Sequence, residues 1–592
     1  MSGYDMAIAI GGEAGQGIAT PGDILARLFT RRGLHLNTYN AFQSIVRGGH
    51  IFLTMRMTEE MKYSHGDKLD MLVCLNQDTL TKHLHLMGPG TAVVYNGDNA
   101  TPGQMEDGVQ LCPLPIGELT GTPRAGLNQN TVMIGTVMYL LGLDFEILKE
   151  SITQQFQRKG DKVVEDNVRV AQLGYDHAVK HFTAFISQIP TFDKQYGMWS
   201  GNEAIGMGGA AAGCKFYAAY PMSPSTGVLH WFAQNARHFG AMVRQIEDEI
   251  GVANIIIGAA HTGVRSMAAT SGGGFALMTE AVGAAAMMEI PAVYIDVMRA
   301  GPSTGVPTKT EQGDLWQALG ASQGDFQRFI VAPLTARDAF DTMPEIFNLT
   351  DRFQTPGIVL SDLLISEGRY SVDPDDLNMH PEIDRGATIT EPSTNGGEYQ
   401  RYQFTDNGVS PRAVAGLEGY VHVVATDEHE ENSGLISDEW TNPHKRRAMV
   451  EKRARKFDNI VDEIVGPELV GDADAEVTLI GWGSTYAAIV DALPILAERG
   501  INANYLPVRW LVPLHAEKIA QVFADAKRTI IVENNHSGQF ARFLRGETGL
   551  VADGHIRKYD GEPFMPHHIA DGVIDNIVNK TEQYIPYQEV VV

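Results

Sequence analysis

Hydrophobic and polar positions follow two periods along most of this chain, a short one typical of strands and a longer one typical of helices. The alternation is most regular in residues 198–370, where the apolar runs 215–220, 265–271 and 292–298 are each followed by a helical segment or a polar loop. Parallel strands joined by right-handed crossovers place such loops at one edge of a sheet. The pattern therefore predicts an α/β fold with a parallel sheet and converging loops.

Four blocks follow from where this periodicity begins and lapses. Residues 1–192 start with an apolar strand, the glycine loop GGEAGQG and a helix, and then carry several more strand-like runs. Residues 198–370 form the regular α/β block, residues 371–470 are polar and rich in turn signals, and residues 471–592 return to alternating strands and helices. We expect a multi-domain α/β protein with one polar connecting segment.

Composition narrows the class of protein. The chain has 592 residues, of which 44% are hydrophobic and 20% charged, and it carries a net charge of −26. Such an anionic surface disfavours nucleic acid and anionic membranes as partners. Its three cysteines are far apart, which disfavours disulfides, a zinc site and a four-cysteine iron–sulfur site in this chain. No signal-like segment or long apolar run is present, so we expect a cytoplasmic enzyme or enzyme subunit without a metal site.

The first glycine loop allows several interpretations. Gly12, Ala14 and Gly17 approximate a G-x-A-x-x-G pattern between a strand and a helix, where pyrophosphate can bind. A dinucleotide fold expects an acidic residue after the second strand, but this strand carries Asn37 and Asn40. A structural turn, a site for another anionic ligand and a dinucleotide site all stay open.

Polar residues leave the strands of the second block at three places. The segment Tyr220–Thr226 offers three serine and threonine hydroxyls, of which Ser225 or Thr226 suits a helix N-cap and leaves Ser223 for a ligand. Glu249 begins an almost wholly apolar helix, so we expect a buried carboxyl that can donate a proton to a ring nitrogen. Arg299 opens a loop rich in hydroxyls and glycine, and its planar fork suits a substrate carboxylate.

Together these motifs resemble one enzyme family. GGEAGQG and QSIVRGGH are similar to the gamma portion of 2-oxoacid:ferredoxin oxidoreductases, and YPMSPST, RQIEDEIG, TSGGGFALMTE and RAGPSTGVPTKTEQGDL to their alpha portion. From end to end the chain resembles the fused gamma–alpha subunit of the 2-oxoglutarate:ferredoxin type. The resemblance implies a gamma domain, a thiamine-diphosphate pyrimidine-type domain and a transketolase C-terminal-like domain.

The resemblance also implies a reaction and its partners. Thiamine diphosphate would be shared with a separate beta subunit that carries the diphosphate site, Mg²⁺ and a 4Fe–4S cluster, while ferredoxin accepts electrons and coenzyme A accepts the acyl group. Glu249 is implied as the catalytic carboxyl on the aminopyrimidine, with Tyr220 and Pro221 beside the cofactor. Ser223, Arg299 and Thr308 are implied to bind the substrate carboxylate. Two alpha and two beta chains are expected to assemble.

Alternatives remain for the substrate and for weaker clusters. Another 2-oxoacid, such as a branched-chain one or pyruvate, competes with 2-oxoglutarate, and a non-catalytic scaffold or electron-transfer subunit is a further alternative. Lys309 or Arg265 could meet a second substrate carboxylate. The run Asp427–Glu431 is interpreted as a solvated acidic loop rather than a metal site. The turn Gly481–Ser484 resembles a phosphate turn, but we interpret its block as an interface.

Overall fold

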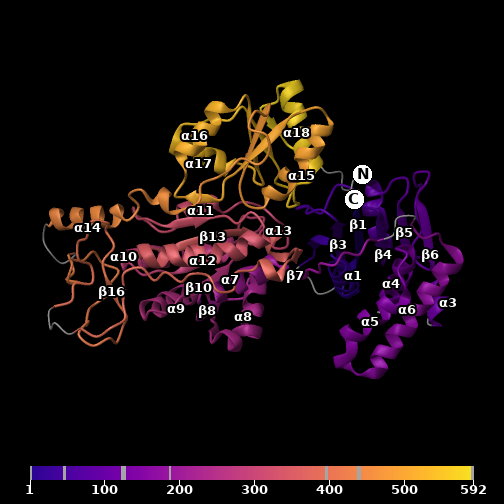
Figure 1. Cartoon of the computed structure of the whole chain (residues 1–592), viewed down its shortest axis with the longest axis horizontal. Helices are drawn as coiled ribbons and strands as arrows, with labels where there is room; N and C mark the ends of the chain where they lie inside the picture. Colours follow the sequence, from indigo (N-terminus) through magenta and orange to yellow (C-terminus); the bar gives the residue numbers. More distant parts are fainter. Residues whose placement is uncertain are drawn as a thin grey trace.

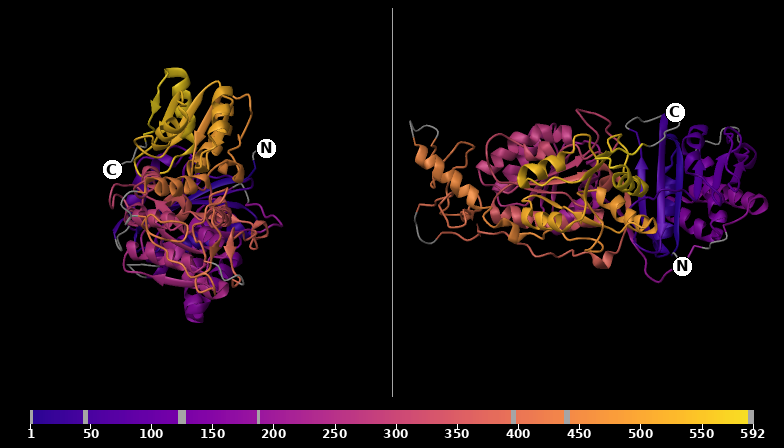
Figure 2. Two further views of the ribbon diagram at one scale, coloured as in Figure 1. Left: turned by 90° about the vertical axis from the view of Figure 1, so that its left-hand side faces the viewer. Right: turned by 90° about the horizontal axis from the view of Figure 1, so that it is seen from above.

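A computed structural model describes residues 3–43, 48–121, 128–185, 189–393, 398–436 and 442–587 of the chain. Three α/β units, each built on its own sheet, make up most of the molecule (Figure 1). The N-terminal unit lies beside the central unit, the C-terminal unit covers one side of the central unit, and a narrow arm carrying α14 projects from the far end (Figures 1 and 2). The predicted multi-domain α/β fold is confirmed.

The first sheet has eight strands in the order β6-β5-β4-β1-β3-β2-β14-β7. Its strands are β1 Asp5–Ala14, β2 His35–Ala41, β3 Gly48–Thr58, β4 Met71–Cys74, β5 Ala92–Asn96, β6 Gln110–Leu114, β7 Gly197–Ser200 and β14 Arg369–Val372. Its helices are α1 Ala19–Arg31, α2 Gln77–His83, α3 Ile116–Thr120, α4 Asn128–Leu140, α5 Phe145–Phe156 and α6 Asp161–His181, with short 3-10 turns at Leu84–Leu86 and Gln157–Lys159. The antiparallel pairs β1–β3 and β2–β3 make this sheet mixed.

The predicted glycine loop is shorter than its sequence suggests. β1 continues through the first four residues of GGEAGQG because β3 supplies ladder partners, such as Phe52 for Gly11. A Cβ built on Gly11 would lie 2.4 Å from Thr79 Cγ2, and one on Gly12 would lie 3.1 Å from Leu75 Cβ. These glycines therefore admit neighbouring side chains, which supports the interpretation as a structural turn.

The central sheet has the order β19-β12-β13-β11-β10-β8-β9 and is parallel except at β19. Its strands are β8 Phe216–Ala219, β9 Met242–Gln245, β10 Ser266–Thr270, β11 Val293–Met298, β12 Phe329–Val331, β13 Gly357–Asp362 and β19 Trp510–Val512. Its helices are α7 Gly201–Ala211, α8 Thr226–Phe239, α9 Glu249–His261, α10 Gly272–Met287, α11 Leu315–Leu319, α12 Ala336–Phe353 and α13 Leu363–Glu367. The run GGG at residues 272–274 forms the first turn of α10.

Strands pair across the predicted block boundaries. β7 and β14, at the two ends of the second block, extend the first sheet through the pairs β2–β14 and β14–β7. β19, from the last block, pairs with β12 of the central sheet. The division into blocks 1–192, 198–370, 371–470 and 471–592 stays a prediction, and these strands add rigid links between its parts.

The C-terminal unit has a parallel sheet in the order β18-β17-β20-β21-β22. Its strands are β17 Val477–Gly481, β18 Ala503–Pro507, β20 Thr529–Glu533, β21 Gly554–Arg557 and β22 Gln583–Tyr584, and its helices are α15 Thr485–Glu498, α16 Ala516–Asp525, α17 Gln539–Thr548 and α18 Pro566–Asn579. No helix in the described part of the chain is both long and apolar enough to cross a membrane.

The arm, residues 374–463, contains one helix of more than one turn in the part that the structure describes. Its elements are the 3-10 turn η3 Pro374–Asp376, the short pair β15 Thr388–Ile389 and β16 Arg412–Ala413, helix α14 Pro443–Arg455, and the 3-10 turn η4 Ile460–Glu463. Glu289, fully buried just beyond α10, accepts a hydrogen bond from Lys452 Nζ at 2.7 Å and pairs with Lys456 at 2.8 Å. Although burial acts to raise it, Lys456 and Lys452 hold the pKa of Glu289 below its usual range.

We expect Glu289→Gln to destabilise the docking of the arm. The substitution leaves two buried ammonium groups without their counter-charge, a loss that typically costs about 3 to 5 kcal/mol. Thermal unfolding should begin at a lower temperature, and limited proteolysis should cleave the arm faster. Glu451→Gln is the control, because the Glu451–Arg447 pair is exposed and contributes little. Equal stability of the two variants would contradict the assignment.

The Asp427–Glu431 segment packs against α14, so the prediction of a solvated loop was wrong. Glu428 accepts hydrogen bonds from Arg453 at 2.8 and 2.7 Å, and Glu430 pairs with Lys445. His429 is 1% exposed, and its ring lies 3.7 Å from that of Tyr402. No group of three or more His, Cys, Asp or Glu residues suited to a metal ion occurs in the described ranges. The segment instead forms ion pairs with the basic helix α14 inside the arm.

Candidate active site

The predicted site loops meet at one edge of the central sheet. β8, β9, β10 and β11 are parallel, so the segments after them leave the sheet on the same side. These segments carry Tyr220–Ser225, Glu249, the start of α10 and the loop from Arg299 to Asp314. The convergence expected from the strand and loop pattern is present.

Glu249 is placed by the cap of its helix. The carboxylate of Asp248 accepts a hydrogen bond from the Gly251 backbone N–H at 2.7 Å, which fixes Glu249 as the first residue of α9. Glu249 is only 4% exposed, as the apolar sequence of α9 predicts. Its Oε1 has no hydrogen-bond partner among the described residues, and a Cβ on Gly274 would lie 2.7 Å from it. A buried carboxyl oxygen without a partner points to a ligand.

The structure brings Ser223 and Arg299 into direct contact. Arg299 Nη1 donates a hydrogen bond to the carbonyl oxygen of Ser223 at 2.7 Å, so it is the backbone of Ser223 that meets the arginine. Ser225 stands at the N-cap position of α8, but its hydroxyl donates to the Met222 carbonyl at 2.8 Å and makes no cap bond. The predicted side-chain cap was wrong. Tyr220 and Pro221, immediately after β8, are exposed.

Thr308 lies in a loop that folds back on Arg299. The backbone N–H of Ala300 donates to the Lys309 carbonyl at 3.0 Å, and that of Val306 donates to the Ala300 carbonyl at 2.9 Å. These bonds hold Thr308, 5% exposed, in the segment that returns past Ala300. Three of the predicted substrate contacts, Ser223, Arg299 and Thr308, therefore belong to one compact pair of loops.

The C-terminal unit holds this loop in place, which local sequence patterns did not reveal. Lys309 pairs with Glu562, and the Thr310 backbone N–H donates to the Gly561 carbonyl at 3.1 Å. Gln312 exchanges hydrogen bonds with the Asn534 backbone at 2.7 and 3.0 Å. The interface interpretation of this block is thus supported, and Lys309 already has a counter-charge within the chain.

The Gly481–Ser484 turn also supports the loop. Gln312 Nε2 donates to the Trp482 carbonyl at 2.7 Å, and a Cβ on Gly483 would lie 3.0 Å from Gln312 Nε2. Gly483 has a φ of +55°, a conformation that favours glycine. The likeness of this turn to a phosphate turn is therefore explained by its contact with Gln312.

Arg265 lies at the edge of the central sheet opposite to the predicted site. It is 4% exposed and precedes β10, whereas the site lies beyond the other end of that strand. Arg265 Nε donates to Asp351 at 2.7 Å and Nη1 donates to the Ala212 carbonyl at 2.6 Å. The idea that Arg265 meets a second substrate carboxylate was wrong.

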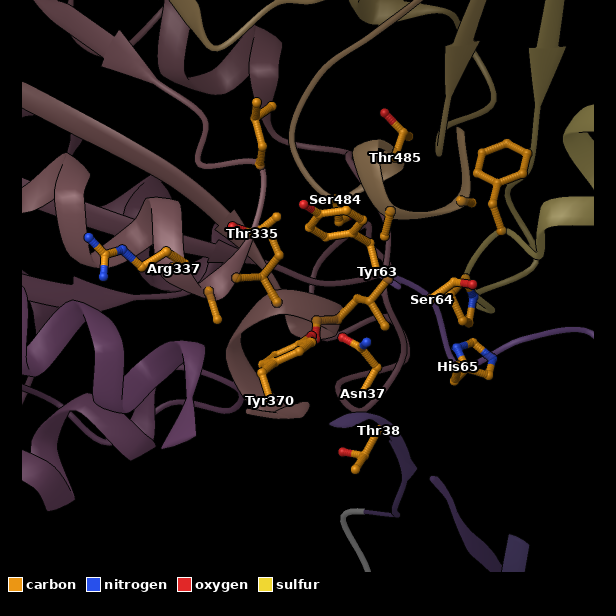
Figure 3. A pocket seen from close by; sticks show the side chains of 18 of the residues that line it. Asn37, Thr38, Tyr63, Ser64, His65, Thr335, Arg337, Tyr370, Ser484 and Thr485 are labelled. Atoms are coloured by element: carbon orange, nitrogen blue, oxygen red, sulfur yellow. The ribbon is translucent and has the colours of Figure 1, made fainter. Parts of the chain in front are cut away.

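Two cavities lie where the three units meet. The smaller, about 80 Å³, is lined by side chains from all three, among them Asn37, Thr335 and Ser484 (Figure 3). The larger, about 250 Å³, lies beside Lys309 and Glu562 and is lined by further lysines and by histidines, namely Lys68, Lys82, His50, His65, His83 and His85. Glu249 lines neither of these two cavities. Thr310 and Lys309, in the same site loop as Arg299, each line one of these cavities.

Comparisons with known proteins agree with this architecture. Family models described as "Pyruvate ferredoxin/flavodoxin oxidoreductase", "Pyruvate flavodoxin/ferredoxin oxidoreductase, thiamine diP-bdg" and "Transketolase, C-terminal domain" match residues 7–177, 207–449 and 469–544. A solved structure of 2-oxoglutarate:ferredoxin oxidoreductase from Magnetococcus marinus, with 2-oxoglutarate, coenzyme A and succinyl-CoA bound, is 30% identical. Its TM-score is 0.88, with 97% of this chain and 99% of that chain covered.

Curated relatives point to the same family. The 2-oxoglutarate oxidoreductase subunit KorA of Mycobacterium tuberculosis is 30% identical over 95% of this chain and 90% of that protein. The alpha subunit of 2-oxoacid:ferredoxin oxidoreductase 2 from Aeropyrum pernix is 28% identical over 98% of this chain and 99% of its own length. The chain belongs to the alpha subunits of the 2-oxoacid:ferredoxin oxidoreductases. The predicted family and enzyme class are confirmed, and relatives of this alpha subunit act with a partner subunit.

The start of α10 offers a test of how this alpha subunit positions Glu249. We expect Gly274→Ala to lower turnover by at least about tenfold, because the added methyl would lie 2.1 Å from Thr270 Oγ1 and 2.7 Å from Glu249 Oε1. Gly546→Ala in α17, with nothing within 4 Å of the added methyl, is the matched control. Steady-state turnover with the partner chain is the measurement. Equal activity of both variants would show that Glu249 need not occupy this position.

Proposed function

We propose that this chain is the alpha subunit of a thiamine-diphosphate-dependent 2-oxoglutarate:ferredoxin oxidoreductase that is active with a separate beta subunit. It would convert 2-oxoglutarate, coenzyme A and oxidised ferredoxin reversibly to succinyl-CoA, CO₂ and reduced ferredoxin. The observation that carries the proposal is the buried Glu249 carboxyl with an unpartnered oxygen at the edge of the parallel sheet. A subunit that served only as scaffold has no need of such a group, because an unsatisfied buried carboxyl oxygen costs stability.

The residues around Glu249 fit the pyrimidine half of thiamine diphosphate. The unpartnered Oε1 can share a proton with a ring nitrogen, and Tyr220 and Pro221 leave the neighbouring strand β8 at the same edge. When bound, the cofactor would supply the electron sink that decarboxylation of a 2-oxoacid requires. Glu249 would hold the proton at its buried oxygen, which lies against Gly274 at the start of α10.

The two loops that carry Ser223, Arg299 and Thr308 would bind the substrate. The guanidinium of Arg299 has one nitrogen, Nε, without a partner among the described residues, while Nη1 is anchored on Ser223. A planar guanidinium fixed at one nitrogen can offer its other N–H groups to the substrate 1-carboxylate, with Thr308 supplying a hydroxyl. These contacts would orient the bond to be broken. Because Lys309 is paired with Glu562, the second carboxylate has no assigned cation on this chain.

The proposal of 2-oxoglutarate as the substrate rests on the names and bound ligands of relatives. KorA of Mycobacterium tuberculosis is named a 2-oxoglutarate oxidoreductase subunit, and the Magnetococcus marinus structure holds 2-oxoglutarate. The Aeropyrum pernix relative is named for 2-oxoacids in general at similar identity. A branched-chain 2-oxoacid or pyruvate is therefore the competing substrate.

A partner surface flanks the Glu249 position. Ile250 on α9 is 54% exposed and Leu277 on α10 is 51% exposed. Exposed apolar side chains beside a half-built site suit a second subunit that completes it. We assign to that beta subunit the diphosphate and Mg²⁺ site and a 4Fe–4S cluster, in an assembly of two alpha and two beta chains that serves ferredoxin in the cytoplasm.

A substrate panel tests the proposal. The chain is co-purified with the product of the neighbouring gene, and 2-oxoacid- and coenzyme-A-dependent reduction of a viologen dye is measured. We expect kcat/KM for 2-oxoglutarate to exceed that for pyruvate and branched-chain 2-oxoacids by at least about tenfold. A preference for another 2-oxoacid would overturn the substrate, and no reduction with any of them would overturn the function.

A further inference from the structure

Two aspartates share the site edge with Arg299. Asp296 lies in β11, three residues before Arg299, and is fully buried. Asp314 ends the same loop, immediately before α11, and rests against α10: a Cβ on Gly272 would lie 2.4 Å from Asp314 Oδ2. The strand register sets Asp296 beside Thr270, two residues before Gly272. Both aspartates therefore lie near the start of α10, where Arg299 leaves the sheet.

Several polar atoms of Asp296, Asp314 and Arg299 lack hydrogen-bond partners among the described residues. Both oxygens of Asp296 and Oδ2 of Asp314 have no hydrogen-bond partner among the described residues, and the same holds for Arg299 Nε. Buried polar groups in native proteins are normally paired, so an unpaired set of this size is uncommon. The three side chains therefore form a small group of titratable side chains with unpaired polar atoms.

The pKa values of the two aspartates are raised, so the pair is partly protonated near neutral pH. Burial raises the pKa of Asp296 well above its usual range, and Asp314 raises it further, while Arg299 opposes the rise. Burial also raises the pKa of Asp314 to about 6, again against Arg299. Glu311, in the same loop, has its pKa raised to about 7 by burial, Asp314 and Asp560 of the C-terminal unit. Near neutral pH the aspartate pair thus carries about one proton.

We propose that Asp314, paired with Asp296, takes up a proton when the substrate carboxylate binds Arg299, so that the 2-oxoacid and a proton bind together. An ionised Asp314 offsets part of the Arg299 charge in the free enzyme. An incoming carboxylate adds a second anion to the same guanidinium, and protonation of Asp314 removes the excess. Asp314 is then a positioning residue for Arg299, and the inference rests on the proposed function.

The affinity for the substrate should fall as the pH rises above the pKa of Asp314. Well below pH 6 Asp314 is protonated with or without substrate, so affinity does not change with pH. Above that pH the free enzyme is ionised and binding requires a proton, so affinity falls as pH rises. A shift of one pKa unit on binding would weaken affinity by up to about tenfold between pH 6 and 8.

Competitive inhibition by glutarate tests this coupling. Glutarate has both carboxylates but no 2-oxo group, so its inhibition constant reports binding without chemistry. With the alpha and beta chains together, we expect the constant to rise between pH 6 and 8 for the wild type and to stay flat for Asp314→Asn. Glu311→Gln, the control in the same loop, should keep the wild-type rise.

A rise retained in Asp314→Asn, or lost only in Glu311→Gln, would overturn the assignment. If Asp314→Asn does not assemble, proton uptake is measured on the wild-type complex in weakly buffered dye at pH 7; glutarate should cause net uptake, and none would overturn the proposal. Failure of the proposed function looks different, because the wild-type complex would then reduce no viologen with any 2-oxoacid.

Discussion

Glu249→Gln, co-expressed with the partner chain, should assemble normally and lose at least about 100-fold in turnover. The amide keeps the shape of the carboxyl, so the helix cap at Asp248 and the packing of α9 should persist. It cannot, however, pass a proton to a ring nitrogen, and loss of a positioned acid–base group typically lowers rates by 10² to 10⁴. The measurement is steady-state viologen reduction with saturating 2-oxoacid and coenzyme A.

The control for this prediction is Glu247→Gln, two residues away on the exposed connection before α9. It changes the same functional group without entering the buried site, so its turnover should stay within about twofold of wild type. Size-exclusion chromatography should show equal assembly for both variants. Near-normal turnover of Glu249→Gln would remove the proposed mechanism. Failure of Glu249→Gln to assemble would instead give the carboxyl a structural role at the subunit boundary.

Local patterns were sufficient for the central sheet and for the burial of Glu249. Strand and helix periods alternate regularly there, and an acid that opens an apolar helix is readily recognised. The same patterns could not show that Lys309 is paired with Glu562, because that contact joins residues 253 positions apart. Nor could they place β14 in the first sheet, since its partner β2 comes from the start of the chain.

Buried polar residues explain the remaining differences between the predictions from the sequence and the structure. Asp296 interrupts an otherwise apolar strand, which is a recognisable signal, but its relation to Asp314 depends on the fold of the loop between them. Glu428 looked solvated because its neighbours are all polar, yet arginines of α14 cover it. In both cases the decisive partner lies on another element, and only the three-dimensional structure supplies it.

Arg299→Ala should mainly weaken capture of the 2-oxoacid. A charge-assisted bidentate contact to a carboxylate is worth about 1.5 to 3 kcal/mol, so the apparent KM should rise by about 10- to 100-fold. We expect kcat to fall less, because Glu249 and the cofactor half-site stay in place. The measurement is the dependence of viologen reduction on 2-oxoacid concentration, with coenzyme A held saturating.

Arg299→Lys separates charge from geometry. Lysine keeps the positive charge but lacks the fork, so it cannot hold the Ser223 carbonyl and a carboxylate in the same plane. Its KM should therefore lie between those of the wild type and Arg299→Ala. Arg447→Ala, on the exposed face of α14 in the arm, should leave KM unchanged. An unaltered KM in Arg299→Ala would rule out the carboxylate role, since no contact to the substrate could then have been lost with the guanidinium.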